Sequence, residues 1–222
     1  MNNKKIILFL SAVGLIWTSC NPNSRKLKKR ATQPNDEVQK VIDELDLEYV
    51  VEGAREIITY EEVNAAQQAW CDALVKIGQI KAAGGDYRGF AKQVLSEAYN
   101  YEYGKVFFKP TLAHGDQTFR NDKAGALSYF IGGDPNYPND KGFALAPWVK
   151  ARYANVGGNT EGIQIYGSVA ITMGNVWVTG KDGVEVMVDK TWVFKKGEDE
   201  KLRIIVHKSS MPFVPLGLSK TI

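Results

Sequence analysis

Asp189 and His207 are the residues of this chain whose types and spacing most favour acid–base chemistry. Both lie in runs of alternating side chains that predict neighbouring antiparallel strands. If Phe194 pairs near Leu202 across the turn, Asp189 and His207 stand nearly opposite each other, and the carboxylate can orient the imidazole. One interpretation is a general acid and base in a pocket, and the other is a polar pair on the exterior or in an interface.

A stripe of alternating side chains on the preceding run predicts one wall of a cavity. Trp177 and Asn175 lie in register with three apolar residues, Val169, Ile171 and Met173. An apolar surface with an occasional amide suits the wall of a small-molecule site, and an ordinary core stripe has the same pattern.

Metal and cofactor chemistry lack the residues they need. Cys71 is the only thiol besides Cys20 and has no CxxC spacing, so zinc and redox sites lack ligands. His114 belongs to a His-Gly-Asp turn signature, where a surface position is expected and a metal ligand is not. We therefore expect no metal, no cofactor, and a buried Cys71 on a helix.

The first twenty residues predict a bacterial lipoprotein signal. Lys4 and Lys5 precede an apolar run of about a dozen residues, too short to span a bilayer comfortably. The run ends in a Thr-Ser-Cys sequence similar to a lipobox, although a Trp stands three residues before the cysteine. Residues 1–19 are then a signal peptide, Cys20 carries the lipid and 20–35 is a basic linker; an ordinary secretory signal is the alternative. This prediction anchors the protein by its N-terminal lipid at the bacterial cell envelope, facing the periplasm.

Composition limits the remaining possibilities. The 222 residues are 44% hydrophobic and 11% aromatic, enough for one sizeable core. There are 28 Lys and Arg against 25 Asp and Glu, a net charge of +3, so no nucleic-acid partner is expected.

The order of elements predicts helices first and strands afterwards. After a helical lead-in at 36–58, Thr59 opens a capping box that begins a long helix. Two shorter helices follow, and the Pro-rich loop at 134–147 is long enough to be expected over a binding site. Strands are expected at 148–156, 162–166, 168–179, 184–195 and 202–209. Helices on one face of a curved antiparallel sheet make an α+β domain over 59–214, followed by a tail at 215–222.

Four short segments link this order to a known family. They are Gly-Gly-Asp at 84–86, Gly-Ile-Gln-Ile-Tyr-Gly at 162–167, Lys-Lys-Gly at 195–197 and the closing Val-His-Lys-Ser-Ser-Met-Pro at 206–212. With them the chain resembles the nuclear transport factor 2-like, or SnoaL-like, cone fold, most closely its calcium/calmodulin-dependent protein kinase II association-domain branch. The resemblance implies a concave sheet face that lines a cavity under the helices and a convex face that forms a homodimer contact.

The chain departs from that branch at its pocket. Trp177 and Thr191 stand where the association domain has arginines, so an anion held by arginines is not implied, and Trp177, Asn175 and Thr191 are the candidate ligand contacts. Similar bacterial chains often carry the label phosphoribosyl-AMP cyclohydrolase. That enzyme binds zinc through three cysteines, which this chain does not offer.

Two functions of different classes follow from the sequence. The first is a lipid-anchored protein whose cavity binds a small, partly apolar molecule, with acid–base chemistry such as isomerisation or dehydration at Asp189 and His207. The second is a homodimeric association or binding module without chemistry. The cyclohydrolase label is a third alternative, disfavoured because it has no metal site.

Overall fold

A long helix, α4 (Tyr60–Ala82), begins at the predicted capping box. The computed structural model describes residues 57–215, so the predicted signal, Cys20 and the linker lie outside the described residues. Thr59 Oγ1 accepts the Glu62 N–H at 3.2 Å, and the Glu62 carboxylate accepts the Thr59 N–H at 2.8 Å. The capping box is therefore confirmed, and it satisfies two N–H groups that the first turn would leave without partners.

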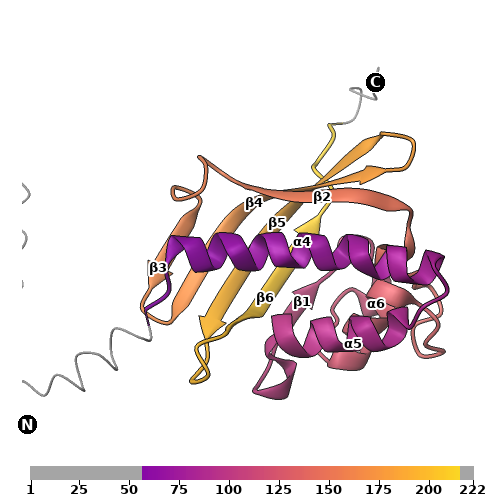
Figure 1. Ribbon diagram of the computed structural model, residues 1–222, viewed down its shortest axis with the longest axis horizontal. Helices are drawn as coiled ribbons and strands as arrows, with labels where there is room; N and C mark the ends of the chain where they lie inside the picture. Colours follow the sequence, from indigo (N-terminus) through magenta and orange to yellow (C-terminus); the bar gives the residue numbers. More distant parts are fainter. Residues whose placement is uncertain (1–56, 216–222) are drawn as a thin grey trace, which may run out of the picture. The chain divides into compact units, whose positions relative to one another are not determined.

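Six strands form one curved sheet behind this helix (Figure 1). Their order is β1-β6-β5-β4-β2, with β3 also paired to β4; β1 runs parallel to β6 and the other pairs are antiparallel. The strands are β1 (Phe107–Lys109), β2 (Trp148–Asn155), β3 (Ile163–Tyr166), β4 (Val169–Gly180), β5 (Glu185–Lys196) and β6 (Leu202–Ser210).

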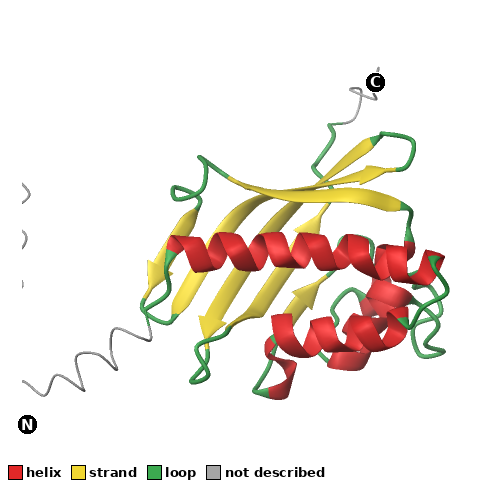
Figure 2. Cartoon of the chain, viewed as in Figure 1, coloured by secondary structure: helices red, strands yellow, loops and turns green. Residues whose placement is uncertain are grey.

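Two shorter helices, α5 (Tyr87–Ala98) and α6 (Lys123–Ile131), lie on the same side of the sheet as α4 (Figure 2). The predicted α+β class, with a curved sheet and helices on one face, is confirmed. No helix within 57–215 combines the length and apolarity that crossing a bilayer requires.

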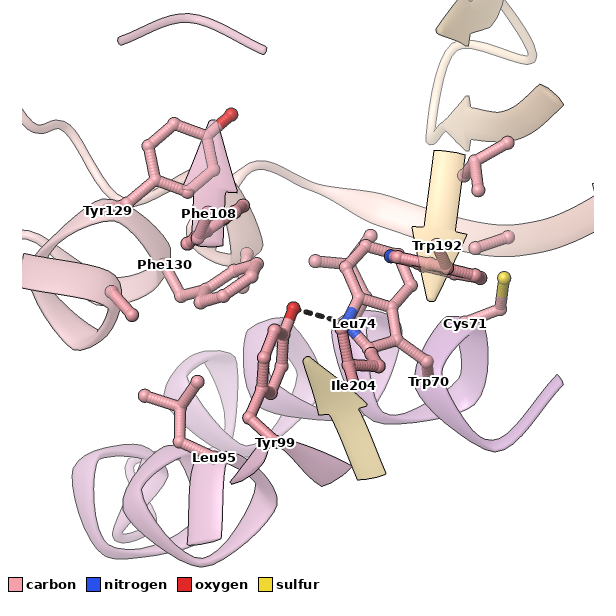
Figure 3. Close-up of a cluster of buried hydrophobic side chains, with 14 of the residues drawn as sticks. Trp70, Cys71, Leu74, Leu95, Tyr99, Phe108, Tyr129, Phe130, Trp192 and Ile204 are labelled. Carbon is pink, nitrogen blue, oxygen red and sulfur yellow. Dashed lines mark hydrogen bonds between the residues drawn. The ribbon is translucent and has the colours of Figure 1, made fainter. Parts of the chain in front are cut away.

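An aromatic core fills the space between α4 and the sheet. Figure 3 shows Trp70 of α4 joined by a hydrogen bond to Tyr99, with Phe108 and Trp192 nearby. The Trp70 and Trp192 rings meet edge to face at 5.2 Å, a favourable arrangement for aromatic pairs. Cys71 is buried on the same helix, as predicted.

The predicted register of the last hairpin is wrong, because Leu202 pairs with Lys196 and a β-bulge near the start of β6 shifts the pairing once more. Phe194 pairs with Ile204, but the next pair is Val193 with Val206, so Ile205 is an extra residue on β6. Beyond the bulge every side chain of β6 changes face relative to β5, because the side-chain period is two. His207 therefore pairs with Trp192 and lies on the buried, helix-covered face.

Candidate functional site

A cavity of about 440 Å³ opens at the end of the sheet where β1 and β6 finish. Its walls come from the segment after β1, the loop before β2 and the first half of β5, and they include Thr111, Tyr129, Phe143, Trp148 and Val188. The loop at 134–147, expected over a binding site, contributes residues 139–143 and 146 to this lining. A mostly apolar cavity of this size suits a small ligand.

Two hydroxyl residues line this cavity, and a third is buried beside one of them. Thr111 and Tyr129 line it, and the Thr111 Oγ1 lies 2.5 Å from the Oγ of fully buried Ser209, directly behind the wall. The Tyr129 hydroxyl accepts the Leu112 N–H at 3.4 Å. Burial raises the pKa of Tyr129 to about 12, so the phenol keeps its proton at neutral pH and can donate it.

Local structure explains why these groups meet. Because β1 runs parallel to β6, with Lys109 opposite Lys208, the residues just after β1 lie beside Ser209. The Lys109 Nζ joins the two segments by donating to the Ser209 carbonyl at 3.2 Å and to the Thr111 carbonyl at 3.5 Å. Asp122 caps α6 by accepting the Gly125 N–H, and the helix then turns Tyr129 toward the cavity.

Charged and titratable groups occur at the rim. His114 lines the cavity, and its Nδ1 lies 3.1 Å from the Leu112 carbonyl. Since a carbonyl only accepts, this hydrogen bond requires a proton on Nδ1. Arg120 and Asp140 form an ion pair at 2.9 Å in the same wall, with side chains 2% and 6% exposed. The sequence predicted His114 in a surface turn, and the structure adds that this turn borders the cavity.

His207 lies in the core, close to the cavity but not in its lining. Its Nδ1 is 2.8 Å from the Tyr99 hydroxyl, and its Nε2 is 2.6 Å from the Nζ of Lys190. The ring stacks on Phe108 with centroids 4.5 Å apart. Burial, and next the nearby Lys190, lower the pKa of His207 well below its usual value, so the imidazole is neutral.

The predicted pairing of Asp189 with His207 is wrong. Asp189 pairs with Ser210 rather than with His207, and its carboxylate accepts a hydrogen bond from the Asn175 amide at 2.9 Å. Because of the bulge, His207 points to the helices while Asp189 points to the opposite face of the sheet. The acid–base pair therefore does not form.

The predicted cavity wall also lies on this opposite face. Along β4 the residues Val176 and Val178 are buried under the helices, whereas Asn175 and Trp177 alternate with them on the outer face. Trp177 packs there against Arg152, whose guanidinium lies 4.7 Å from the ring centroid. Thr191 of β5 pairs across from the exposed Met173 and shares that face. The alternation of side chains along β4 was predicted correctly, but the sequence did not say which face of the sheet the helices cover.

Sequence reasoning missed the three hydroxyl residues in and beside the cavity wall. Thr111, Tyr129 and Ser209 are distant in the chain, and no spacing rule links them. The one signal available was the His-x-Ser pattern of the closing strand, since it places Ser209 two residues after His207 on the same face.

No group of three or more His, Cys, Asp or Glu side chains arranged to hold a metal ion occurs in the part of the chain that the structure describes. The hydroxyl residues Thr111 and Tyr129 stand in a cavity wall whose exposed surface is largely apolar. Such an arrangement can hold a small, planar, oxygen-rich species through donated hydrogen bonds.

Comparison with known proteins identifies the family of the chain. Residues 61–211 match the family model described as metal-independent carbonic anhydrase. A metal-independent carbonic anhydrase from Nostoc sp. strain PCC 7120 is 49% identical over 158 residues, which cover 70% of this chain and 75% of that protein.

Solved structures give the same result. A cyanobacterial iota-carbonic anhydrase complexed with bicarbonate is 48% identical with a TM-score of 0.68, and the match covers 72% of this chain and 96% of that one. A putative calcium/calmodulin-dependent protein kinase II association domain from Xanthomonas campestris is 19% identical with a TM-score of 0.44, covering 69% and 88%. The resemblance stated above anticipated a group found among these neighbours, but it did not name the carbonic anhydrases. The chain belongs to the metal-independent carbonic anhydrase family.

Proposed function

We propose that this protein interconverts carbon dioxide and bicarbonate in the cavity lined by Thr111 and Tyr129. The observation that carries the proposal is the pair of hydroxyl residues in the wall of an apolar cavity, with a third buried beside one of them, in a chain of this family. Bicarbonate is the ligand in the solved relative, and its three oxygens suit several convergent donors.

The hydroxyl directions follow from burial. Within residues 57–215, the Ser209 hydroxyl has only the Thr111 hydroxyl as a hydrogen-bond partner. A buried hydroxyl with a single partner is best satisfied by donating to it, so we infer that Ser209 donates to Thr111 and leaves the Thr111 proton available to a ligand. Tyr129 accepts from Leu112 and also keeps its proton for the cavity. Thr111 and Tyr129 are therefore the two donors for an oxygen of the substrate.

These donors suit the charge that hydration creates. A water oxygen bonds to the carbon of CO₂ while one carbon–oxygen π bond opens, and negative charge develops on the former CO₂ oxygens. Donors fixed in advance stabilise that charge without reorganising. The water also loses a proton, which passes to a base in the surrounding solvent. The sum is CO₂ and water giving bicarbonate and a proton, which solvent carries away.

The test is a rate measurement on protein stripped of metal. After dialysis against a chelator, with metal content below one tenth of the protein concentration by elemental analysis, the protein should still accelerate CO₂ hydration in stopped-flow assays. Bicarbonate binding without any acceleration would support the binding-module alternative and overturn the enzyme proposal. Activity that appears only after zinc is added back would overturn the metal-independent mechanism.

We also propose that Cys20, which lies outside the described residues, anchors this activity to the cell envelope. Cys20→Ser should move the protein from the membrane fraction to the soluble fraction and abolish labelling by a fatty-acid probe, because the thioether has no other attachment point. Unchanged fractionation and labelling would contradict the lipid anchor. The homodimer expected from the sequence stays a prediction.

A further inference from the structure

Lys190 of β5 is a buried amine without an acidic partner. The residue is 4% exposed, and its Nζ has one hydrogen-bond partner among residues 57–215, the Nε2 of His207 at 2.6 Å. No carboxylate in this range forms an ion pair with it. The rings of Trp70 and Trp192 lie 4.6 and 5.7 Å from the Nζ. Lysine is seldom buried in this way, so its protonation state needs explaining.

Hydrogen-bond directions along the buried chain give an answer. The Trp70 Nε1 only donates, so Tyr99 accepts from it at 2.9 Å. Tyr99 then has its own proton for the Nδ1 of His207, which must be the unprotonated ring nitrogen. The neutral imidazole therefore carries its proton on Nε2 and donates it to Lys190, which accepts only as a neutral amine. In this arrangement each of the three hydrogen bonds, from Trp70 to Tyr99, from Tyr99 to His207 and from His207 to Lys190, has one donor and one acceptor.

Protonating Lys190 reverses the two hydrogen bonds that His207 makes, while Trp70 still donates to Tyr99. An ammonium group donates to Nε2, the imidazole proton moves to Nδ1 and points at Tyr99, and the Tyr99 hydroxyl proton loses its acceptor. The titratable groups facing Lys190 are Cys71 of α4, Tyr99 after α5 and His207 of β6, with Tyr153 of β2 next to Cys71. Burial raises the pKa values of Cys71, Tyr99 and Tyr153, so none supplies a negative charge at neutral pH. Burial accordingly lowers the pKa of Lys190 to about 7.

The chain is in contact with the cavity wall at two points. Lys190 pairs directly across from Ser209, whose hydroxyl bonds Thr111. His207 stacks on Phe108, and Phe108 meets the Tyr129 ring edge to face at 5.8 Å. Ser209 therefore links the Thr111 hydroxyl to Lys190, and Phe108 links the Tyr129 ring to His207.

We propose that Lys190 is a positioning residue for the cavity: as a neutral amine it holds His207 in one tautomer and the hydroxyl donors in place, and its protonation reverses the two hydrogen bonds of His207 and impairs the site. The effect on catalysis rests on the proposed function, whereas the tautomer change does not. The charge of Lys190 sets the direction of the pH dependence. The site is active above the pKa of Lys190, where the amine is neutral, and loses activity below it.

Nitrogen-15 NMR of the His207 ring in the full-length protein tests the structural part. Above pH 8 the proton should be on Nε2, and it should move to Nδ1 with a midpoint near pH 7. In Lys190→Met, which cannot titrate, the change should be absent, and in Lys195→Met, an exposed lysine on the same strand, it should persist. A single tautomer in the wild type from pH 5.5 to 9 overturns the proposal, even if the Met variant fails to fold.

The rate of CO₂ hydration tests the functional part. With a pKa near 7, kcat/KM of the wild type should fall about tenfold from pH 8 to pH 6, the ratio of neutral amine at the two values. Lys190→Met should have a lower, nearly flat profile, while Lys195→Met should follow the wild type. An inflection of the same midpoint that survives in Lys190→Met belongs to another group and overturns the proposal. A wild type without activity defeats the proposed function instead and leaves the NMR result to decide the role of Lys190.

Discussion

Thr111→Val is expected to lower kcat/KM for CO₂ hydration by about a hundredfold, because it removes a hydroxyl donor from the cavity and keeps the shape of the side chain. Losses of roughly 10²–10³ are typical when one preorganised donor to a developing oxyanion is deleted. Val replaces the hydroxyl with a methyl group of similar size, so stopped-flow rates and the melting temperature together separate lost chemistry from lost folding.

Two further variants sharpen this result. Thr191→Val makes the same chemical change on the outer face of the sheet, opposite Met173, and should leave kcat/KM unaltered. Ser209→Ala removes the hydroxyl behind Thr111 and should cost less than Thr111→Val. The double variant should cost little more than Thr111→Val alone, since residues that act as a unit are not additive. Wild-type rates in Thr111→Val, or an equal loss in Thr191→Val, would contradict this site.

Asp140→Asn is expected to destabilise the fold by about 3 kcal/mol or more, because it leaves the buried Arg120 guanidinium without its counter-charge. Arg120 depends on this carboxylate: its Nε and Nη1 have no hydrogen-bond partner in the described structure, and its other neighbour is the Tyr137 ring at 4.5 Å. For a domain of this size the loss corresponds to a fall in Tm of about 10 °C. Thermal unfolding followed by circular dichroism measures it.

The exposed ion pair between Glu102 and Lys123 provides the control. Glu102→Gln should leave Tm nearly unchanged, because solvent screens exposed pairs. Asp140 also fixes the loop that forms part of the cavity wall, so KM should rise in Asp140→Asn and not in Glu102→Gln. Equal melting temperatures for Asp140→Asn and the wild type would show that the buried pair does not hold the loop.

The sequence by itself determined the elements of this protein. The capping box at Thr59 is a local feature, and a helix start depends on groups within one turn. The long strands were readable for the same reason, since alternation with period two is a property of consecutive residues. The α+β class follows from the order of these elements, and it was confirmed.

Only the tertiary structure decided which side chains meet. The bulge at Ile205 adds one residue to β6 and turns His207 away from Asp189, and no composition signal marks such an insertion. Thr111, Tyr129 and Ser209 come together because β1 runs parallel to β6, a pairing between segments about a hundred residues apart. Lys190 looks like any strand lysine in the sequence, and its pKa falls to about 7 because the helix-covered face buries it away from water. Alternation gives two faces to every strand, and long-range packing decides which one is buried.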